Sequence, residues 1–147
     1  MIADVSTMLE CPATKAWSQV QTSALLRHVT RPLVRFAPSA APLPERWSEG
    51  LTLQWKVFVF GVIPMGVHTV HLEKVDPNNY EIHNREHNRL IARWDHVISI
   101  KPLDNSRSFY RDTVEIDAGI LTFVVWAWAN WLYRHRQRRW RALAKTL

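Results

Sequence analysis

The sequence predicts an α+β fold in which a curved antiparallel sheet packs against a long C-terminal helix. Between residues 51 and 117, apolar and polar side chains alternate in runs separated by turn signals, which is typical of sequential β-strands. From Gly119 onward, apolar residues recur at helical spacing. A sheet of this kind must bury one face, and the long helix is the element available to cover it.

The N-terminal part predicts one strand followed by two short helices. Residues 2–10 can form the strand, and Pro12 suits the first turn of a helix that continues to Val20. A second helix follows, and Pro32 is expected to end or kink it because proline has no backbone N–H. Residues 37–49 hold three prolines and little periodicity, so they are expected to form a loop.

Five further strands are predicted before the long helix, which makes six with the first. Most are separated by turns at residues 61–66, 76–79 and 104–106, which are rich in glycine, proline, asparagine or aspartate. The five strands are residues 51–59, 67–75, 80–87, 90–101 and 108–117.

The C-terminal helix is expected to be buried on one side rather than to cross a membrane. Its apolar run from Gly119 to Tyr133 contains Asn130 and is too short to span a bilayer comfortably. Trp126 lies off the main apolar stripe, where it can pack in a homodimer or close a pocket. The stripe expected to face the sheet comprises Leu121, Val125, Trp128, Leu132 and His135, widened by Phe123, Val124 and Trp131.

The positive charge of the chain is local. The formal net charge is +6, from 19 basic and 13 acidic residues, and residues 134–145 hold basic residues and no acid. Arginines near the end of a helix suit its macrodipole and keep that end solvated, which is the leading interpretation. An anionic membrane surface, helped by Trp131 and Trp140, is an alternative that allows weak contact. No nucleic-acid motif accompanies the charge, so no nucleic-acid partner is expected.

Cysteine usage and the N-terminal segment predict a cytoplasmic location. Cys11 is the only cysteine, so no intramolecular disulfide can form, which fits a reducing compartment. We expect it to be a packed small residue at the end of a strand. Residues 1–10 lack the basic and apolar segments of a signal peptide.

No metal or cofactor is predicted. Residues 83–87 spell H-x-x-E-H, a zinc-protease pattern that requires a helix so that both histidines converge on one metal. Here the pattern lies in a predicted strand, where His83 and His87 are well separated and lack a third ligand. His68 and His71 have odd spacing, so they should point to opposite faces of their strand. The sequence also lacks a nucleophile elbow and a phosphate-binding glycine loop.

One polar constellation is expected on the apolar face of the sheet. Alternation places Tyr110 and Asp112 inward on one strand and His96 inward on its neighbour. With a turn centred near Asn105, His96 and Asp112 lie opposite or diagonal to each other, within hydrogen-bond reach. A histidine held by a carboxylate beside a tyrosine hydroxyl can do acid–base chemistry. The alternative is a buried polar pair that is merely satisfied.

Several short segments, taken in order along the chain, carry a resemblance to a known superfamily: residues 12–17, 61–66, 93–96, 117–119 and 133–140. The chain resembles the START-like, or SRPBCC, superfamily, and in particular its uncharacterised and polyketide-cyclase-like bacterial members. The resemblance covers nearly the whole chain and implies a single ligand-binding domain over residues 1–147 with a helix-grip fold of six or seven strands. It also implies a cavity between sheet and helix, but no particular reaction.

The leading hypothesis is therefore binding of a hydrophobic or amphipathic small molecule, lipid-like or polyketide-like, in that cavity. One alternative is a cyclase or aromatase in which His96, Asp112 and Tyr110 are catalytic. A second is a membrane- or protein-surface interaction module that uses the basic helix. The expected cavity lining is Leu53, Trp55, Val57, Trp94, His96, Tyr110, Asp112, Val114, Val125, Trp128 and Leu132.

Overall fold

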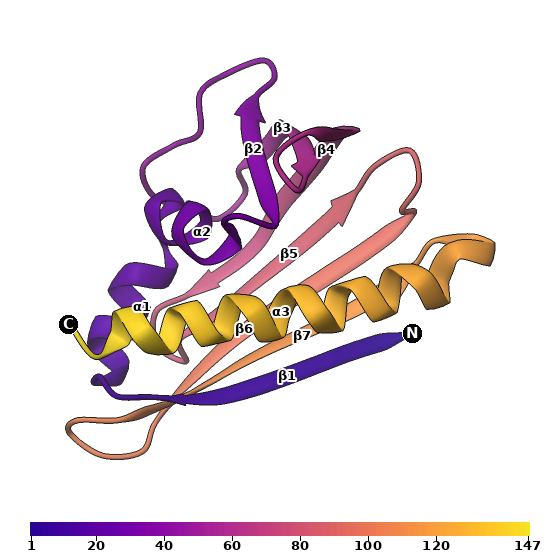
Figure 1. Cartoon of the computed structure of the whole chain (residues 1–147). Helices are drawn as coiled ribbons and strands as arrows, with labels where there is room; N and C mark the ends of the chain where they lie inside the picture. Colours follow the sequence, from indigo (N-terminus) through magenta and orange to yellow (C-terminus); the bar gives the residue numbers. More distant parts are fainter.

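The structure, a computed structural model, describes residues 1–147 as one antiparallel sheet with a long helix across it (Figure 1). The α+β helix-grip prediction is confirmed, and the boundaries of α1 and β7 agree with the predicted ones. The elements are β1 (Ile2–Leu9), α1 (Ala13–Val20), α2 (Ser23–Thr30), β2 (Val34–Pro38), β3 (Thr52–Val59), β4 (Ile63–Asp76), β5 (Glu81–His87), β6 (Arg93–Pro102), β7 (Ser108–Asp117), a 3₁₀ turn (Gly119–Leu121) and α3 (Thr122–Ala144).

The sheet has seven strands in the order β1-β7-β6-β5-β4-β3-β2, and every neighbouring pair is antiparallel. The chain thus runs from β2 to β7 as a meander and places β1 beside β7. In Figure 1, α3 crosses one face of the sheet next to β1, and α2 lies on the other side of α3. A curved sheet closed on one side by helices can enclose a space between these layers.

The strand missing from the sequence prediction is β2, so the predicted count of six strands is one short. β2 is only five residues long and lies at the edge of the sheet, where it pairs with β3 through Val34–Val59 and Phe36–Val57. Its last residue is Pro38, which an edge strand tolerates because one side of its backbone needs no partner. The predicted loop over 37–49 is wrong at its first two residues for this reason.

The turn predicted at 61–66 is shorter in the structure, because β4 already begins at Ile63. Pro64 can lie inside this strand because β5 pairs with β4 only from Thr69 onward. Phe60 and Gly61 both have positive φ, at 53° and 75°, which matches the backbone of a tight hairpin turn. The tip of the β3–β4 hairpin therefore extends beyond the end of β5.

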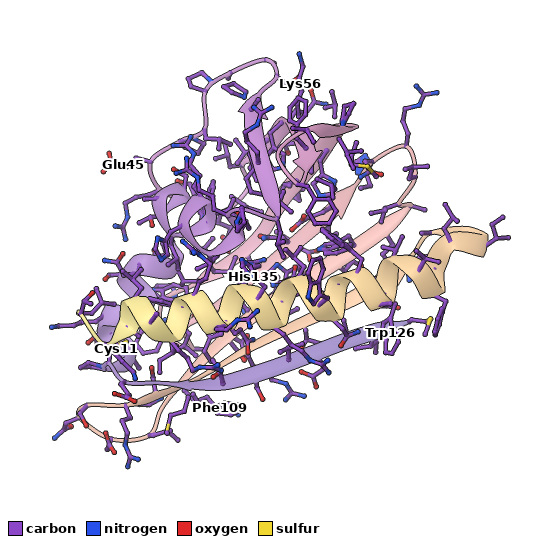
Figure 2. All side chains as sticks on the ribbon, in the orientation of Figure 1. Cys11, Glu45, Lys56, Phe109, Trp126 and His135 are labelled. Atoms are coloured by element: carbon purple, nitrogen blue, oxygen red, sulfur yellow. The ribbon has the colours of Figure 1, made fainter.

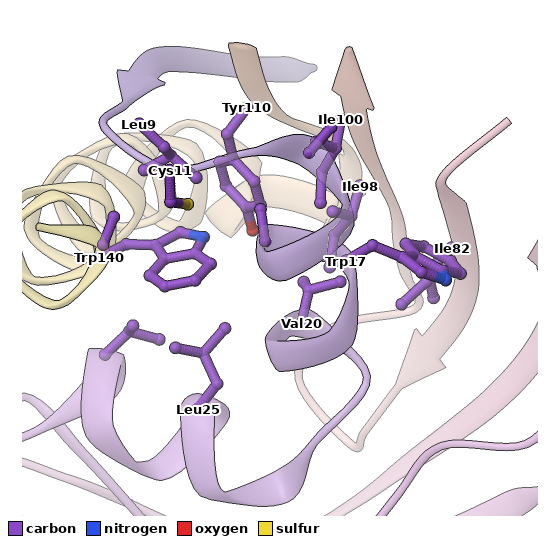
Figure 3. Close-up of a cluster of buried hydrophobic side chains, with 14 of the residues drawn as sticks. Leu9, Cys11, Trp17, Val20, Leu25, Ile82, Ile98, Ile100, Tyr110 and Trp140 are labelled. Carbon is purple, nitrogen blue, oxygen red and sulfur yellow. The ribbon is translucent and has the colours of Figure 1, made fainter. Parts of the chain in front are cut away.

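The main hydrophobic core lies at the end of the sheet covered by α1, α2 and the C-terminal half of α3. Trp140 of α3 meets Tyr110 of β7 edge-on, with ring centroids 6.4 Å apart, and Leu9 and Cys11 pack beside them (Figure 3). Cys11 is buried as expected, and burial raises the pKa of its thiol. This packed end closes one side of the fold and leaves the opposite end, near the start of α3, less filled.

The apolar stripe predicted for α3 is wrong in part. Phe123 is 64% exposed, Trp131 is 48% exposed and Leu121 is 42% exposed, although the sequence stripe included them. Val124 is 64% exposed but still borders the space between helix and sheet. The first half of α3 is apolar on nearly all sides, so periodicity could not select the inward side. His135 is also off the buried side, and its ring Nε2 donates to the Arg31 carbonyl at 2.8 Å. The buried residues of α3 are Ala129, Leu132, Tyr133, Gln137, Trp140 and Ala144.

Some basic residues of α3 also make contacts within the fold. Arg139 donates to the His28 carbonyl at 2.7 Å, which ties α3 to α2. Arg141 donates to the Thr7 hydroxyl at 2.9 Å, which ties α3 to β1. Arg136 lines the interior of the protein. Arg136 and Arg139 are therefore only half-exposed, whereas Arg141 keeps an exposed side chain, as do Arg134, Arg138 and Lys145, in line with a solvated basic helix end.

Trp126, which lies off the predicted apolar stripe of α3, is hydrogen-bonded within the protein. The indole N–H of Trp126 donates to the Ile2 carbonyl at 2.8 Å, so the ring is held between α3 and β1 (Figure 2). None of the helices combines the length and the apolar character that crossing a bilayer requires.

Candidate functional site

A cavity of about 470 Å³ lies between the sheet and the helices α2 and α3. Of its 34 lining residues, 25 are hydrophobic, and strands β2 to β7 contribute most of the wall. Small-molecule sites in proteins have volumes of roughly 300–1,000 Å³ and are mostly apolar with a few convergent polar groups. The cavity therefore has the size and the surface chemistry of a ligand site.

Ten of the eleven residues predicted to line the cavity do so. They are Leu53, Trp55, Val57, Trp94, His96, Tyr110, Asp112, Val125, Trp128 and Leu132.

Val114 is the exception, and the structure corrects its predicted place. It faces inward but is fully buried in a packed cluster that includes Ala3 of β1 and Ala129 of α3. Both alanines are small, so the helix rests directly on the sheet at this level. No space remains there, and Val114 is a packing residue.

His96 and Asp112 meet as the alternation predicted. His96 Nε2 lies 2.9 Å from Asp112 Oδ1, and the Tyr110 hydroxyl donates to the same oxygen at 3.0 Å. The other carboxylate oxygen of Asp112 accepts from the Gln137 amide at 2.8 Å. Asp112 is thus fully engaged by three side chains, and all of these residues line the cavity.

A second carboxylate, Glu86, faces the cavity from β5, and its side chain is 12% exposed. Its Oε2 lies 2.7 Å from His68 Nε2, and its Oε1 lies 3.9 Å from His96 Nδ1. The Asn88 side-chain oxygen accepts from two backbone N–H groups, at Leu90 and Ile91, so the Asn88 amide nitrogen faces His68 Nδ1 at 3.2 Å. His68 Nδ1 is then an acceptor, and the ring carries its proton on Nε2 and donates it to Glu86.

The two buried carboxylates stay ionised in this setting. Burial alone raises the pKa of Asp112, but the hydrogen bond from His96 and the charge of Arg136 outweigh it and lower the pKa. Burial likewise raises the pKa of Glu86, and the hydrogen bond that His68 donates reverses this to a net lowering. Two acids are therefore held as anions beside an apolar cavity by neighbours that donate to them.

The two tyrosines of the cavity stay protonated. Burial first, and then the Asp112 charge, raise the pKa of Tyr110 well above its usual value. Burial also raises the pKa of Tyr133, whose hydroxyl accepts the Trp94 indole N–H at 3.2 Å. The Arg136 guanidinium lies over the Tyr133 ring, with 4.7 Å between its Cζ and the ring centroid. These rings form a polar wall around His96.

The residues that the sequence interpretation missed are Glu86, His68, Asn84, Arg136 and Gln137, all of which line the cavity. Glu86 belongs to the H-x-x-E-H run, which lies on strand β5 as expected and not on a helix. Alternation on β5 turns Glu86 inward and places His83 near Glu81, with Nε2 and Oε2 3.2 Å apart. Strand alternation within this run predicts that Glu86 faces inward, whereas the metal-binding pattern directs attention to its two histidines.

The expectation that His68 and His71 point to opposite faces of β4 is confirmed. His68 is buried at the cavity, whereas His71 bonds the exposed Thr52 hydroxyl through Nδ1 at 2.9 Å on the other face. No group of three or more His, Cys, Asp or Glu side chains is arranged to hold a metal ion.

Aromatic side chains lie near the less filled end of the cavity, where Trp128 is part of the lining. Phe60 of the β3–β4 turn packs edge-on against Trp128 of α3 at 5.8 Å and against Trp131 at 6.2 Å between ring centroids. Phe60, Ile63 and Trp131 are each about half exposed. The β3–β4 hairpin and the first half of α3 thus meet over the cavity only through a few side chains.

Comparison with known proteins identifies the fold. A family model described as "Domain of unknown function (DUF8410)" matches residues 7–144. No curated protein matches the sequence.

Solved structures match over almost the whole chain. A START superfamily protein from Mycobacterium smegmatis has a TM-score of 0.69 at 16% identity, covering 99% of this chain and 97% of that one. The Zhui aromatase/cyclase from Streptomyces sp. R1128 has a TM-score of 0.65 at 11% identity, covering 99% and 93%. A protein from Chromobacterium violaceum has a TM-score of 0.73 at 10% identity, covering 97% and 96%. At these identities the likeness is one of fold, and the fold is START-like (SRPBCC).

Proposed function

Because the chain belongs to the family described as "Domain of unknown function (DUF8410)" and has a START-like fold, we propose that it binds a hydrophobic or amphipathic small molecule in the cavity between sheet and α3. The ligand is of lipid-like or polyketide-like character, and residues 1–147 act as one ligand-binding domain. The free, buried thiol of Cys11 fits a reducing compartment, so we place this activity in the cytoplasm.

The observation that carries the proposal is the cavity itself. It is predominantly apolar, has a volume of about 470 Å³, and is bounded by a fixed sheet on one side and packed helices on the other. Burial of apolar ligand surface contributes roughly 25 cal/mol per Å², so such a wall supplies most of the binding free energy. The polar groups around His96 fix the orientation of the ligand.

Binding without turnover is favoured over catalysis by the hydrogen bonds of the polar cluster. The Tyr110 hydroxyl donates to Asp112, and its raised pKa makes it a weak acid toward a substrate. His96 Nε2 is occupied by Asp112. The three residues proposed as catalytic are thus engaged mainly with one another.

A cyclase- or aromatase-like reaction is the second candidate function, and one observation favours it. His96 Nδ1 lies 3.9 Å from Glu86 Oε1, which is beyond a hydrogen bond, so this nitrogen is free to exchange a proton with a bound substrate. Asp112 then holds the ring in one orientation and one tautomer. The likeness to the Zhui aromatase/cyclase is compatible with this candidate.

Native mass spectrometry of the protein purified from its own host tests the proposal. We expect a population heavier than the 17.2 kDa chain, whose excess mass is released by denaturation and identifies the ligand class. A carrier releases an unchanged molecule, and His96→Ala reduces its retention only. If the released molecule is converted when incubated with fresh protein, and His96→Ala abolishes this conversion, the second candidate replaces the first. A bare chain mass in every preparation contradicts both.

A further inference from the structure

Four buried side-chain polar atoms have no hydrogen-bond partner in the protein: Trp55 Nε1, Asn84 Oδ1, Arg136 Nε and Trp140 Nε1. All four belong to residues that line the cavity. Buried polar atoms are almost always paired, because an unpaired one costs about 1–3 kcal/mol. Their concentration around one cavity indicates that they are satisfied by what the cavity binds. Three of the four are donors, so the bound molecule must chiefly offer acceptors.

Arg136 is the charged member of this set. It lies on the inward side of α3, one helical turn before Trp140, and its guanidinium stacks over the Tyr133 ring. Burial alone lowers the pKa of this guanidinium, but the nearby Tyr133, Asp112, Tyr110 and Glu86 raise it, so the group keeps its charge. No carboxylate oxygen lies within 4.0 Å of its nitrogens, since Arg136 takes part in none of the ion pairs.

The two acids that could pair with Arg136 are already committed to other donors. Asp112 accepts from His96, Tyr110 and Gln137, and Glu86 accepts from His68. These anions compensate the charge of Arg136 at a distance, but they accept no hydrogen bond from the N–H groups of its planar guanidinium. A guanidinium binds a carboxylate through two parallel hydrogen bonds, and this pairing gains strength where water is excluded.

From this arrangement we infer that the ligand is an acidic amphiphile, whose carboxylate is bound by Arg136 and whose apolar body fills the cavity between α3 and the sheet. This inference rests on the proposed function and adds the chemical class of the ligand. Trp55 and Trp140 offer further N–H donors to oxygen atoms along the ligand body. Asn84 Oδ1, the one unpaired acceptor, receives a ligand hydroxyl group.

A matched pair of probes tests the inference: dodecanoate and dodecanol, which share one apolar chain and differ in the head group. Binding of each is measured by tryptophan fluorescence, below micelle-forming concentrations and at a pH where the acid is ionised. We expect the wild-type protein to bind dodecanoate roughly ten- to a hundredfold more tightly than dodecanol, the ratio that one charge-assisted hydrogen-bond pair provides.

Two variants assign the preference to a residue. Arg136→Met keeps an unbranched apolar stem and removes the donors, so it should bind both probes with the affinity of dodecanol. Arg134→Met, on the exposed side of the same helix, should keep the full preference for the acid. Arg136→Lys retains a charge without the fork and should keep only part of the preference. If Arg136→Met does not fold, the wild-type ratio and the lysine variant still decide.

Each outcome separates the inference from the proposed function. Equal affinity of the wild-type protein for both probes overturns the acidic-ligand inference and leaves apolar binding in place. A preference for the acid that persists in Arg136→Met overturns the role of Arg136. Saturable binding of neither probe contradicts the proposed function, and the inference then fails with it.

Discussion

His96 and Asp112 form a buried pair, 2.9 Å apart, although they are not direct partners in the sheet. In the register of β6 and β7, His96 lies opposite Val114 and Asp112 lies opposite Ile98, so the contact is diagonal. Diagonal neighbours on one face of a sheet are within reach when one side chain is long or aromatic. The pair is therefore a consequence of strand alternation combined with the turn position.

This pair makes a first prediction about His96. Asp112→Asn removes the charged acceptor of Nε2, so the proton distribution between the two ring nitrogens should change. We expect the ¹⁵N chemical shifts of the two His96 ring nitrogens to move measurably in NMR spectra. Gln137→Ala, which removes a different partner of Asp112, should move them less. Identical His96 spectra in wild type and Asp112→Asn would mean that the pair does not exist in solution.

The second prediction concerns stability in acid. The pKa values of Asp112 and Glu86 are lowered in the folded protein, whereas unfolded side chains have pKa values of about 3.9 and 4.3. The unfolded chain therefore binds protons first as the pH falls, and the stability that both acids contribute above about pH 5 is lost below about pH 4.

Urea unfolding at about pH 7 and about pH 3.5 measures this loss. Asp112→Asn should be less stable than wild type at neutral pH and should lose less on acidification. Glu86→Gln should behave in the same way, and it serves if Asp112→Asn does not fold. Glu115→Gln, on the outer face of β7, is the control. A wild-type protein whose stability is unchanged between these pH values would contradict the ionised state of the buried pair.

The third prediction compares two cavity tryptophans. Trp94 is 7% exposed and its N–H donates to Tyr133, so Trp94→Ala should cost about 3–5 kcal/mol of unfolding free energy. Tyr133→Phe leaves that N–H unpaired and should cost about 1–3 kcal/mol. Trp128 is only half-buried at the cavity wall, so Trp128→Ala should cost less than Trp94→Ala and should mainly weaken the fluorescence response to an apolar ligand. Unchanged stability and response in both alanine variants would show that neither ring faces the interior.

The fourth prediction concerns zinc. Because His83 and His87 lie on a strand and not on one helical face, we expect no stoichiometric zinc at this pair. Elemental analysis of the purified protein measures the metal content. One zinc per chain, lost on replacing either histidine by alanine, would refute this prediction.

Most of the fold followed from local sequence signals, and the failures have physical causes. In strands β3 to β7 the apolar and polar residues alternate clearly, and turns with Asp, Asn, Pro or Gly separate the strands. The alternation and the turn residues therefore predict the same elements. β2 was not predicted, because it is an edge strand of only five residues that ends in Pro38, and its alternation is too short to detect. The predicted inward side of α3 was wrong in part, because aromatic residues surround the first half of the helix. The buried side of the helix includes Ala129, Gln137 and Ala144, which hydrophobic periodicity does not select.

The candidate site was predictable only where alternation and register sufficed. His96, Tyr110 and Asp112 share one hairpin, so their meeting could be expected from two adjacent strands. Arg136 and Glu86 come from α3 and β5, and only the packing of the helix on the sheet brings them to the same cavity. Arg136 lies in a run of arginines that suits a solvated helix end, and Glu86 lies in a motif that resembles a metal site. Only the tertiary structure shows that both side chains line the cavity.

The measurement that tests the central claim most directly is a titration with the neutral apolar fluorophore N-phenyl-1-naphthylamine. Wild-type protein should bind one molecule per chain with saturable enhancement of its emission. Val57→Trp fills the cavity from β3 and should abolish this binding, whereas Lys56→Trp, exposed on the opposite face of the same strand, should not. Failure of the wild-type protein to bind the fluorophore, or equal binding by both variants, would contradict a ligand site between the sheet and α3.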